Sequence, residues 1–258
     1  MANTLENWLR AAPLPLPEAR ILLQHCTGLS RAQLLTRGRD ALGGDNEAAL
    51  AALVQRRLAG EPMAYIVGVR EFYGRTFIVN DAVLIPRPET EHLVEAALAR
   101  LPPQGRLWDL GTGSGAVAVT VALERPDVHV RASDISADAL AVAARNAASL
   151  GAKLEFAQGS WFAVDRPSET QVYDVVVSNP PYIEAGDVHL QQGDLRFEPQ
   201  QALTDFGDGL SCLRALAAGA PHVLKAGGWL LLEHGYNQGE AARALLVQHD
   251  FVEVATLP

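Results

Sequence analysis

Cysteine is scarce in this sequence, and its scarcity excludes two kinds of protein. The 258 residues contain only Cys26 and Cys212, which lie far apart and belong to no CxxC pattern. Two such cysteines are too few for a disulfide framework and are not spaced as zinc ligands. We therefore expect both thiols to be reduced, and we expect no metal site.

Long hydrophobic runs are also missing. No stretch of about 18 uncharged apolar residues occurs, as a transmembrane helix would need. Met1–Arg10 lacks the apolar core that a signal peptide carries. These absences predict a cytoplasmic protein that makes no contact with a membrane.

Positive charge is in short supply as well. The formal net charge is −9, and Lys153 and Lys225 are the only lysines. A protein that binds nucleic acid through its phosphates usually has a basic balance or a basic face. We therefore expect no direct contact with nucleic acid, and we take the chain to be a monomer.

The pattern of the first seventy residues predicts a small helical bundle, which we assign as a first domain over residues 1–70. Pro17 opens a helix that continues through residues 19–26. Ser30 and Gln33 form a capping-box pattern before a second helix. A third helix is expected from about residue 46 to residue 58.

A change in composition after residue 70 predicts a β-hairpin over residues 71–87 that links two domains. Residues 72–79 alternate aromatic and β-branched side chains. Asn80 and Asp81 are typical of a turn, and residues 83–85 would form the returning strand.

The rest of the chain, residues 88–258, alternates strand and helix patterns and predicts an α/β fold. Such alternation is typical of a mostly parallel, Rossmann-like sheet with helices on both faces. In these sheets a ligand binds beyond the carboxyl ends of the strands, where the strand order reverses. Strands are expected at residues 107–110, 128–132, 154–157, 173–178, 229–233 and 251–255, and helices at 116–123, 137–150, 211–224 and 238–248.

A glycine-rich loop follows the first of these strands. It contains Gly111, Thr112, Gly113, Ser114 and Gly115, and it opens a helix. Glycine lets a ligand approach the backbone closely and tolerates a positive φ. The loop fits the looser dinucleotide fingerprint G-x-G-x-x-A. By itself it does not distinguish a nicotinamide cofactor from S-adenosylmethionine.

Two aspartates near this loop favour S-adenosylmethionine. Asp134 ends the next strand, where its carboxylate can accept hydrogen bonds from both ribose hydroxyls of an adenosine. Asp134 or Ser136 could instead cap the following helix. Asp109, just before the loop, suits the ammonium group of a methionine moiety and would repel a pyrophosphate.

The segment Asn179-Pro180-Pro181-Tyr182 follows the apolar strand at residues 173–178 and predicts the chemistry. A planar amide or amine nitrogen is a poor nucleophile, so it must be fixed in line with a sulfonium methyl group. The Asn179 side-chain oxygen and the Pro180 carbonyl can each accept one N–H bond from such a group. Tyr182 offers a flat face for stacking. The two prolines could alternatively do no more than stop the strand.

These motifs together resemble the release-factor glutamine methyltransferases, a family of class I methyltransferases. The segment 179–182 is shared with methyltransferases of adenine and cytosine amines, whereas residues 85–91 and 232–235 narrow the resemblance to this family. The segments that carry it are Glu61–Gly68, Ile85–Glu91, Asn179–Tyr182, Asp194–Pro199 and Leu232–Gly235.

The resemblance implies that S-adenosylmethionine is the cofactor, S-adenosylhomocysteine the product, and a peptide chain release factor the substrate. It implies that Gly111 through Gly115 hold the methionine end, that Asp134 binds the ribose and that Trp161 packs near the adenine. We also expect Asn179 to contact the cofactor. The segment 179–182 would hold the glutamine of a Gly-Gly-Gln tripeptide. The helical domain would recognise the protein substrate.

The resemblance also implies that Arg87 and Glu89 border the substrate site. Pro88 and Glu89 could instead only initiate a helix, because proline and acidic residues suit the first turn. Both roles can hold together.

The chain departs from the family pattern in two places. Ser160 stands where members often have an acidic residue, so an acceptor for the adenine amine is expected to be weaker or absent. The chain stops at Pro258, so we expect the family's final strand, which would pair with residues 251–255, to be missing.

Three other functions are compatible with parts of the sequence. A nucleic-acid amine methyltransferase shares the segment 179–182 and the cofactor loop. A nicotinamide-dependent oxidoreductase shares only the glycine loop. A binding module without activity would follow if the expected loss of the final strand abolished catalysis.

Overall fold

The computed structural model of the protein describes residues 3–164 and 172–257. The chain divides into two compact units, Met1–Gly68 and Val69–Pro258. In the described residues, no helix combines the length and the hydrophobicity that crossing a membrane requires.

The N-terminal unit is helical, as predicted. Leucines from its helices form its core, among them Leu22, Leu23 and Leu50, which are fully buried. The capping box of Ser30 and Gln33 is confirmed, with both reciprocal hydrogen bonds present. The sequence interpretation missed the first and last helices. The helices are α1 (Leu5–Ala11), α2 (Leu16–Thr27), α3 (Arg31–Thr36), α4 (Gly44–Leu58) and α5 (Met63–Val67).

A β-hairpin begins the second unit, but its turn is not where the sequence predicted it. Strands β1 (Val69–Phe72) and β2 (Arg75–Ile78) pair in antiparallel register around Tyr73 and Gly74. Residues 83–85 form no strand, which corrects the prediction. Their backbone is engaged elsewhere, since the Val83 N–H donates to the Asn80 carbonyl.

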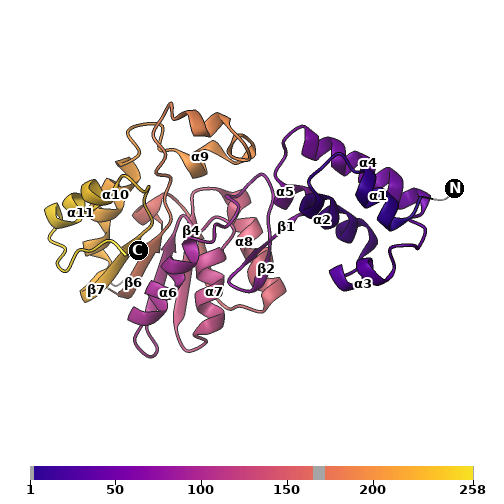
Figure 1. The fold of residues 1–258 in the computed structure, drawn as a ribbon. Helices are drawn as coiled ribbons and strands as arrows, with labels where there is room; N and C mark the ends of the chain where they lie inside the picture. The colour runs from indigo at the N-terminus through magenta and orange to yellow at the C-terminus, as the bar shows by residue number, and fades with distance from the viewer. Residues whose placement is uncertain (1–2, 165–171, 258) are drawn as a thin grey trace. The chain divides into compact units, whose positions relative to one another are not determined.

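The second unit is built on a parallel sheet, which confirms the predicted fold class. Its strands are β3 (Arg106–Leu110), β4 (His129–Asp134), β5 (Glu155–Gln158), β6 (Tyr173–Ser178) and β7 (Leu224–Leu232). Within the described residues the strand order is β5-β4-β3-β6-β7, and every neighbouring pair runs parallel (Figure 1). The order reverses at β3, because β4 and β5 extend to one side of it and β6 and β7 to the other.

Helices cover both faces of this sheet (Figure 1). They are α6 (Thr90–Arg100), α7 (Ala116–Glu124), α8 (Ala137–Leu150), α10 (Ser211–Gly219) and α11 (Gly239–Gln248). The short helix α9 (Gln200–Leu203) lies away from these faces, in the segment before α10. Side chains alternate along β3, so Leu107 packs under α6 and α7 whereas Trp108 and Leu110 pack toward α10. Asn146 of α8 is fully buried and bonds to the Ile78 backbone and the Ser114 carbonyl, which ties the hairpin to the glycine loop.

The C-terminal part corrects two further predictions. The helix expected to reach Leu224 ends as α10 at Gly219, because Pro221 interrupts it and a short 3₁₀ turn, Ala220–His222, follows. Residues 251–255 form no strand. Asp250 and Glu253 both have positive φ, at 64° and 55°, and these values break the extended conformation that a strand needs.

Candidate active site

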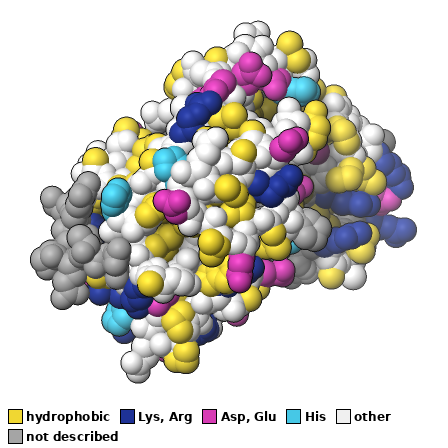
Figure 2. Space-filling view, turned by 90° about the vertical axis from the view of Figure 1, so that its left-hand side faces the viewer, with side chains coloured by type: hydrophobic (Ala, Val, Ile, Leu, Met, Phe, Trp, Pro, Cys, Tyr) yellow, Lys and Arg dark blue, Asp and Glu magenta, His cyan; other side chains and the backbone are white. Residues whose placement is uncertain are grey.

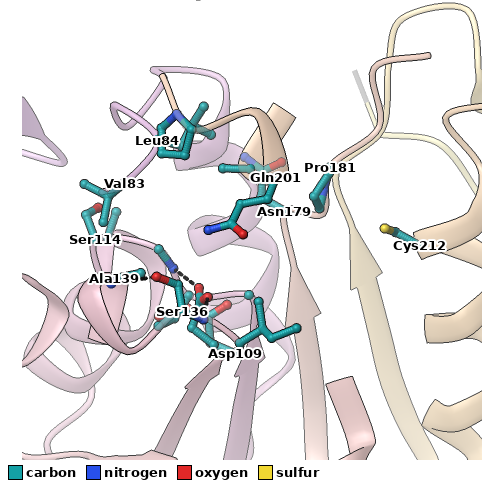
Figure 3. Close-up of a pocket in the computed structure, with 18 of the residues that line it drawn as sticks. Val83, Leu84, Asp109, Ser114, Ser136, Ala139, Asn179, Pro181, Gln201 and Cys212 are labelled. Atoms are coloured by element: carbon teal, nitrogen blue, oxygen red, sulfur yellow. Dashed lines mark hydrogen bonds between the residues drawn. The ribbon is translucent and has the colours of Figure 1, made fainter. Parts of the chain in front are cut away.

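A cavity of about 310 Å³ opens at the carboxyl ends of β3, β4 and β6, where the strand order reverses (Figure 3). This is the place where open parallel sheets bind their ligands. Most of the predicted site residues line it, namely Arg87, Asp109, Gly111, Thr112, Gly113, Ser114, Asp134, Trp161, Asn179 and Pro181.

Four predicted site residues are missing from the described residues that line the cavity. Gly115 is the N-cap of α7 and packs against α8. Pro180 precedes Pro181 in the same segment, and Tyr182 turns its hydroxyl toward Glu233. Glu89 lies at the start of α6, where a turn from Pro88 leads into the helix. Glu89 occupies the N-cap position of α6 without a side-chain capping bond, so its helix-initiating role and its substrate role both stay predictions.

The glycine loop has the backbone conformation that the sequence predicted. Gly111, Gly113 and Gly115 have φ of 73°, 56° and 81°. The Gly111 and Thr112 N–H groups donate to the Ser133 carbonyl, which fixes the loop against β4. A Cβ atom on Gly111 would lie 3.5 Å from the Trp161 ring. A side chain there would fill the space between the loop and the indole.

Asp109 is a buried carboxyl group at the floor of this cavity. It is 2% exposed, and its Oδ2 accepts a hydrogen bond of 2.7 Å from the Thr112 hydroxyl. Burial raises the pKa of Asp109 to about 7, and the negative charge of Asp134 adds to the rise. A buried acid of this kind is stabilised in its charged form by a cationic ligand.

Of the two residues that could cap α8, the structure shows Ser136 as the cap. Ser136 caps α8, since its Oγ accepts from the Ala139 N–H. Asp134 is therefore not needed as the cap. Its carboxylate instead accepts from the Gly113 and Ser136 N–H groups, each at 2.9 Å. Burial raises the pKa of Asp134, and the backbone donors oppose that rise.

Asn179 lies at the end of β6 in a cluster that the sequence interpretation did not foresee. Its Nδ2 donates to the Thr90 hydroxyl at 3.2 Å, and that hydroxyl donates to Glu233 Oε2 at 2.8 Å. The Tyr182 hydroxyl donates to Glu233 Oε1 at 3.3 Å. The cluster thus joins α6, the segment after β6 and the end of β7 beside the cavity.

Glu233 brings a carboxyl group into this cluster and affects the protonation of Tyr182. Burial raises its pKa, while hydrogen bonds from Thr90, Tyr182 and Asn179 oppose the rise. Burial and the Glu233 charge together raise the pKa of Tyr182 to about 12, so the phenol stays protonated. The sequence interpretation offered no carboxylate at this spot, because Glu233 follows a strand 51 positions further along the chain than Tyr182.

Another buried carboxylate, that of Glu198, holds Arg87 at the cavity rim. The Glu198 side chain is fully buried, forms an ion pair with Arg87 and accepts from the Ile85 N–H at 3.0 Å. Residues 85–91 and 194–199 both carry the family resemblance. Their contact with one another, across more than 110 positions, has no local signal.

The rim also includes residues that the sequence interpretation did not predict. Gln201, Ala202, Thr204, Asp205 and Phe206 come from α9 and the loop after it. In the close-up, Gln201 lies near Asn179 and Pro181, above Asp109 and Ser136 (Figure 3). The short helix and its polar composition gave no indication of this position.

The cavity suits S-adenosylmethionine on three structural grounds. A buried carboxyl group, Asp109, has no cationic side chain hydrogen-bonded to it among the described residues. A second carboxylate, Asp134, ends the neighbouring strand. The glycine loop faces an indole, that of Trp161, across a space that a Cβ would reduce. In the part of the chain that the structure describes, no three His, Cys, Asp or Glu side chains gather to hold a metal ion.

Comparison with known proteins supports this fit. Residues 89–208 match the family described as Methyltransferase small domain, and residues 3–68 match the PrmC N-terminal domain. The solved structure of a methyltransferase from Pyrococcus furiosus shares the fold, with a TM-score of 0.50 and 16% identity over 80% of this chain and 87% of that one. Fold, cavity and matched domains define the protein as an S-adenosylmethionine-dependent methyltransferase.

Three curated relatives show which family of methyltransferases the chain is similar to. Each is named release factor glutamine methyltransferase. The protein of Neisseria gonorrhoeae is 65% identical over 99% of this chain and 93% of its own length. That of Bordetella pertussis is 52% identical over 97% and 93%, and that of Escherichia coli 44% over 97% and 93%. The chain belongs to the release factor glutamine methyltransferase family.

Proposed function

We propose that this protein methylates the side-chain amide nitrogen of the glutamine in the Gly-Gly-Gln motif of a peptide chain release factor. The proposal rests mainly on the shared cavity of Asp109 and Asn179. They end neighbouring strands, since Asp109 pairs with Val177 in the sheet register. The proposed cofactor anchor and the proposed acceptor site therefore line the same cavity.

The cofactor end of the cavity is assigned to three side chains and the glycine loop. Asp109 would pair with the ammonium group of the methionine moiety, and Asp134 would accept from the ribose hydroxyls. The Trp161 indole would pack beside the adenine, with Gly111 keeping that space open. Bound there, S-adenosylmethionine would supply an electrophilic sulfonium methyl group, and its sulfur would keep the electron pair of the carbon–sulfur bond.

The acceptor end is assigned to the segment Asn179–Tyr182. The Asn179 oxygen and the Pro180 carbonyl would each accept one N–H bond from the glutamine amide. Two acceptors fix the direction of the nitrogen lone pair and stabilise the positive charge that grows on it. The new carbon–nitrogen bond forms from that lone pair, and one N–H proton then leaves to water. Tyr182, kept protonated, would border the planar amide.

Arg87 and Glu89 are proposed to contact the polypeptide around the glutamine. Arg87 lines the cavity and is anchored by Glu198, so its guanidinium has a defined position. The helical domain over residues 1–70 would recognise the body of the release factor. We place the reaction in the cytoplasm and expect a monomer.

Nucleic acid is the alternative acceptor, and the charge of the protein gives it little support. Figure 2 shows acidic and basic side chains interspersed across the centre of this face, with a group of basic side chains at its right-hand edge. The formal net charge is nevertheless −9. An acidic protein is a poor match for the phosphates of nucleic acid.

The test is mass spectrometry of purified release factor after incubation with the protein and isotope-labelled S-adenosylmethionine. We expect one methyl group on the tripeptide glutamine and none on a release factor whose glutamine is replaced by alanine. DNA and RNA serve as competing acceptors in parallel reactions. Methyl transfer to nucleic acid, with none to the release factor, would overturn the proposal.

A single substitution tests the role of Asn179. Asn179→Ala removes one oxygen acceptor from the reacting nitrogen, so kcat should fall about 10²–10³-fold. Cofactor affinity, measured by calorimetry, should change little, because the cofactor anchors lie on β3 and β4. Equal kcat in variant and parent would contradict the assignment.

A further inference from the structure

Three side chains from separate elements form a chain of hydrogen bonds that ends at the proposed acceptor site. Glu233 follows β7, Thr90 begins α6, and Asn179 follows β6. The Thr90 hydroxyl lies 2.8 Å from Glu233 Oε2 and 3.2 Å from Asn179 Nδ2. Thr90 is only 5% exposed, so water has little access to its hydroxyl.

The direction of each hydrogen bond follows from the chemistry of the groups. Glu233 Oε2 accepts from the Thr90 hydroxyl, and a hydroxyl has a single proton to donate. The Thr90 oxygen then has only lone pairs left for Asn179. Of the two ends of the Asn179 amide, the NH₂ group is the one that can donate to it.

The same conclusion follows from Glu233 itself. Its Oε1 accepts from the Tyr182 hydroxyl, and the Asn179 side chain lowers the pKa of this carboxyl group, which is the effect of a nearby donor. An Asn179 oxygen turned toward Glu233 would meet negative charge without a proton between them. The Thr90 hydroxyl and the Glu233 carboxylate therefore both favour the NH₂ group of Asn179 on this side.

We propose that Glu233 and Thr90 are positioning residues that fix the amide of Asn179, with its NH₂ group toward them and its Oδ1 toward the acceptor. The inference rests on the proposed function, in which Asn179 Oδ1 accepts an N–H bond from the substrate amide. In the flipped orientation an NH₂ group would face the substrate NH₂ group, and two donors cannot bond. The Asn179 amide would then oppose binding of the acceptor in its reactive geometry.

The test compares two substitutions at Thr90. Thr90→Val keeps the shape of the side chain and removes the hydroxyl, whereas Thr90→Ser keeps the hydroxyl. We expect Thr90→Val to lower kcat about 10²-fold, as a misoriented reacting group does, with the cofactor Kd from calorimetry unchanged. Thr90→Ser should restore most of kcat.

Thr120 provides a matched control for the loss of a buried hydroxyl. It is fully buried in α7, and its hydroxyl has no hydrogen-bond partner among the described residues. Thr120→Val should leave kcat unchanged. Comparison of its Tm with that of Thr90→Val separates loss of stability from loss of orientation.

A double variant shows whether Thr90 acts through Asn179. If it does, Thr90→Val should cause no further loss of kcat in the Asn179→Ala background, because the amide that it orients is gone. Glu233→Gln should lower kcat by a smaller factor, since an amide offers Thr90 both a donor and an acceptor and no longer fixes the hydroxyl direction.

Two results would overturn the inference: wild-type kcat in Thr90→Val, or an undiminished effect of Thr90→Val in the double variant. Failure of the proposed function has a different signature, because the unmodified protein would then leave the release factor glutamine unmethylated. In that case the kcat of each Thr90 variant is compared with that of the parent on the nucleic-acid acceptor that is methylated, and the same criteria apply.

Discussion

At the scale of single residues, the site concentrates acidic groups where a cationic cofactor is expected. Asp109 and Asp134 end adjacent strands, and the charge of Asp134 raises the pKa of Asp109. Among the described residues, neither carboxylate is hydrogen-bonded to a lysine or an arginine. Such an arrangement costs stability when the cavity holds no cation, and it increases affinity for one that enters.

Asp109→Asn tests whether this carboxyl group lowers the stability of the protein without cofactor. The pKa of Asp109 is raised from its usual value to about 7, so between pH 4 and 7 the folded protein binds a proton that the unfolded chain releases. Stability from this group therefore falls as pH rises through that window. The variant removes the penalty, and its Tm without cofactor should exceed that of the parent by a few degrees at pH 8. Little difference is expected at pH 4.

The same substitution should weaken cofactor binding. Loss of a charged hydrogen bond to the ammonium group should raise the Kd for S-adenosylmethionine about 10- to 100-fold at pH 8. In the unsubstituted protein, affinity should fall as pH drops below about 7 and Asp109 takes up its proton. Calorimetry at pH values below and above 7 measures the Kd of the unsubstituted protein. A Kd that does not change with pH would contradict the proposed contact of Asp109 with the ammonium group.

At the scale of elements, the glycine loop joins β3 to α7 and depends on close packing against α8. Gly115 has a φ of 81°, and a Cβ atom there would lie 3.1 Å from Ala143 Cβ and 3.2 Å from Val119 Cγ2. Both the backbone conformation and the contact exclude a side chain. The third glycine of the loop therefore serves the packing of α7 on α8, and not the lining of the cavity.

Gly115→Ala should lower the free energy of unfolding by about 1–3 kcal/mol, measured by urea denaturation. Gly151→Ala is the matched control, because Gly151 has a φ of 78° and a Cβ atom there would meet no neighbouring atom within 4 Å. It should cost only the backbone term, about 1 kcal/mol. Equal losses in the two variants would show that the contact with Ala143 does not matter.

At the scale of the whole molecule, a cofactor bound in this cavity would stabilise the folded state against unfolding. A ligand that binds only the folded state stabilises it, by about 2.7 kcal/mol at a concentration of 100 times Kd. The ligand would contact residues after β3 and β4, which contribute to one buried core with α6 and α7. Its effect should therefore appear in global unfolding.

Asp134→Ala tests this stabilisation. S-Adenosylmethionine should raise the Tm of the parent protein and, at the same concentration, raise that of the variant much less, because the variant lacks the proposed ribose acceptor. The Tm of the variant without cofactor is measured separately, since Asp134 also accepts from Gly113 and Ser136. If S-adenosylmethionine raised the Tm of the variant as much as that of the parent, Asp134 would not belong to the binding site.

Local patterns predicted much of the fold. The strand Tyr173–Ser178 and the helix Ala137–Leu150 have the predicted bounds, because an apolar run or a Ser136 cap with a glycine at the end specifies them over a few residues. The sequence predicts a hairpin correctly but misplaces its turn at Asn80-Asp81. Residues 83–85 resemble a strand locally and yet bond to a turn carbonyl and a buried carboxylate.

The sequence by itself determined the class of protein, the glycine loop, the aspartate at the end of β4 and the proline-containing segment after β6. These features depend on neighbours within a few positions, where backbone conformation and capping act. Only the tertiary structure decided that Glu233 faces Thr90 and Tyr182, that Glu198 anchors Arg87, and that residues 251–255 form no strand. The side-chain pairings among these join positions 51 to 143 residues apart, and no short-range preference specifies which buried donor will meet which acceptor.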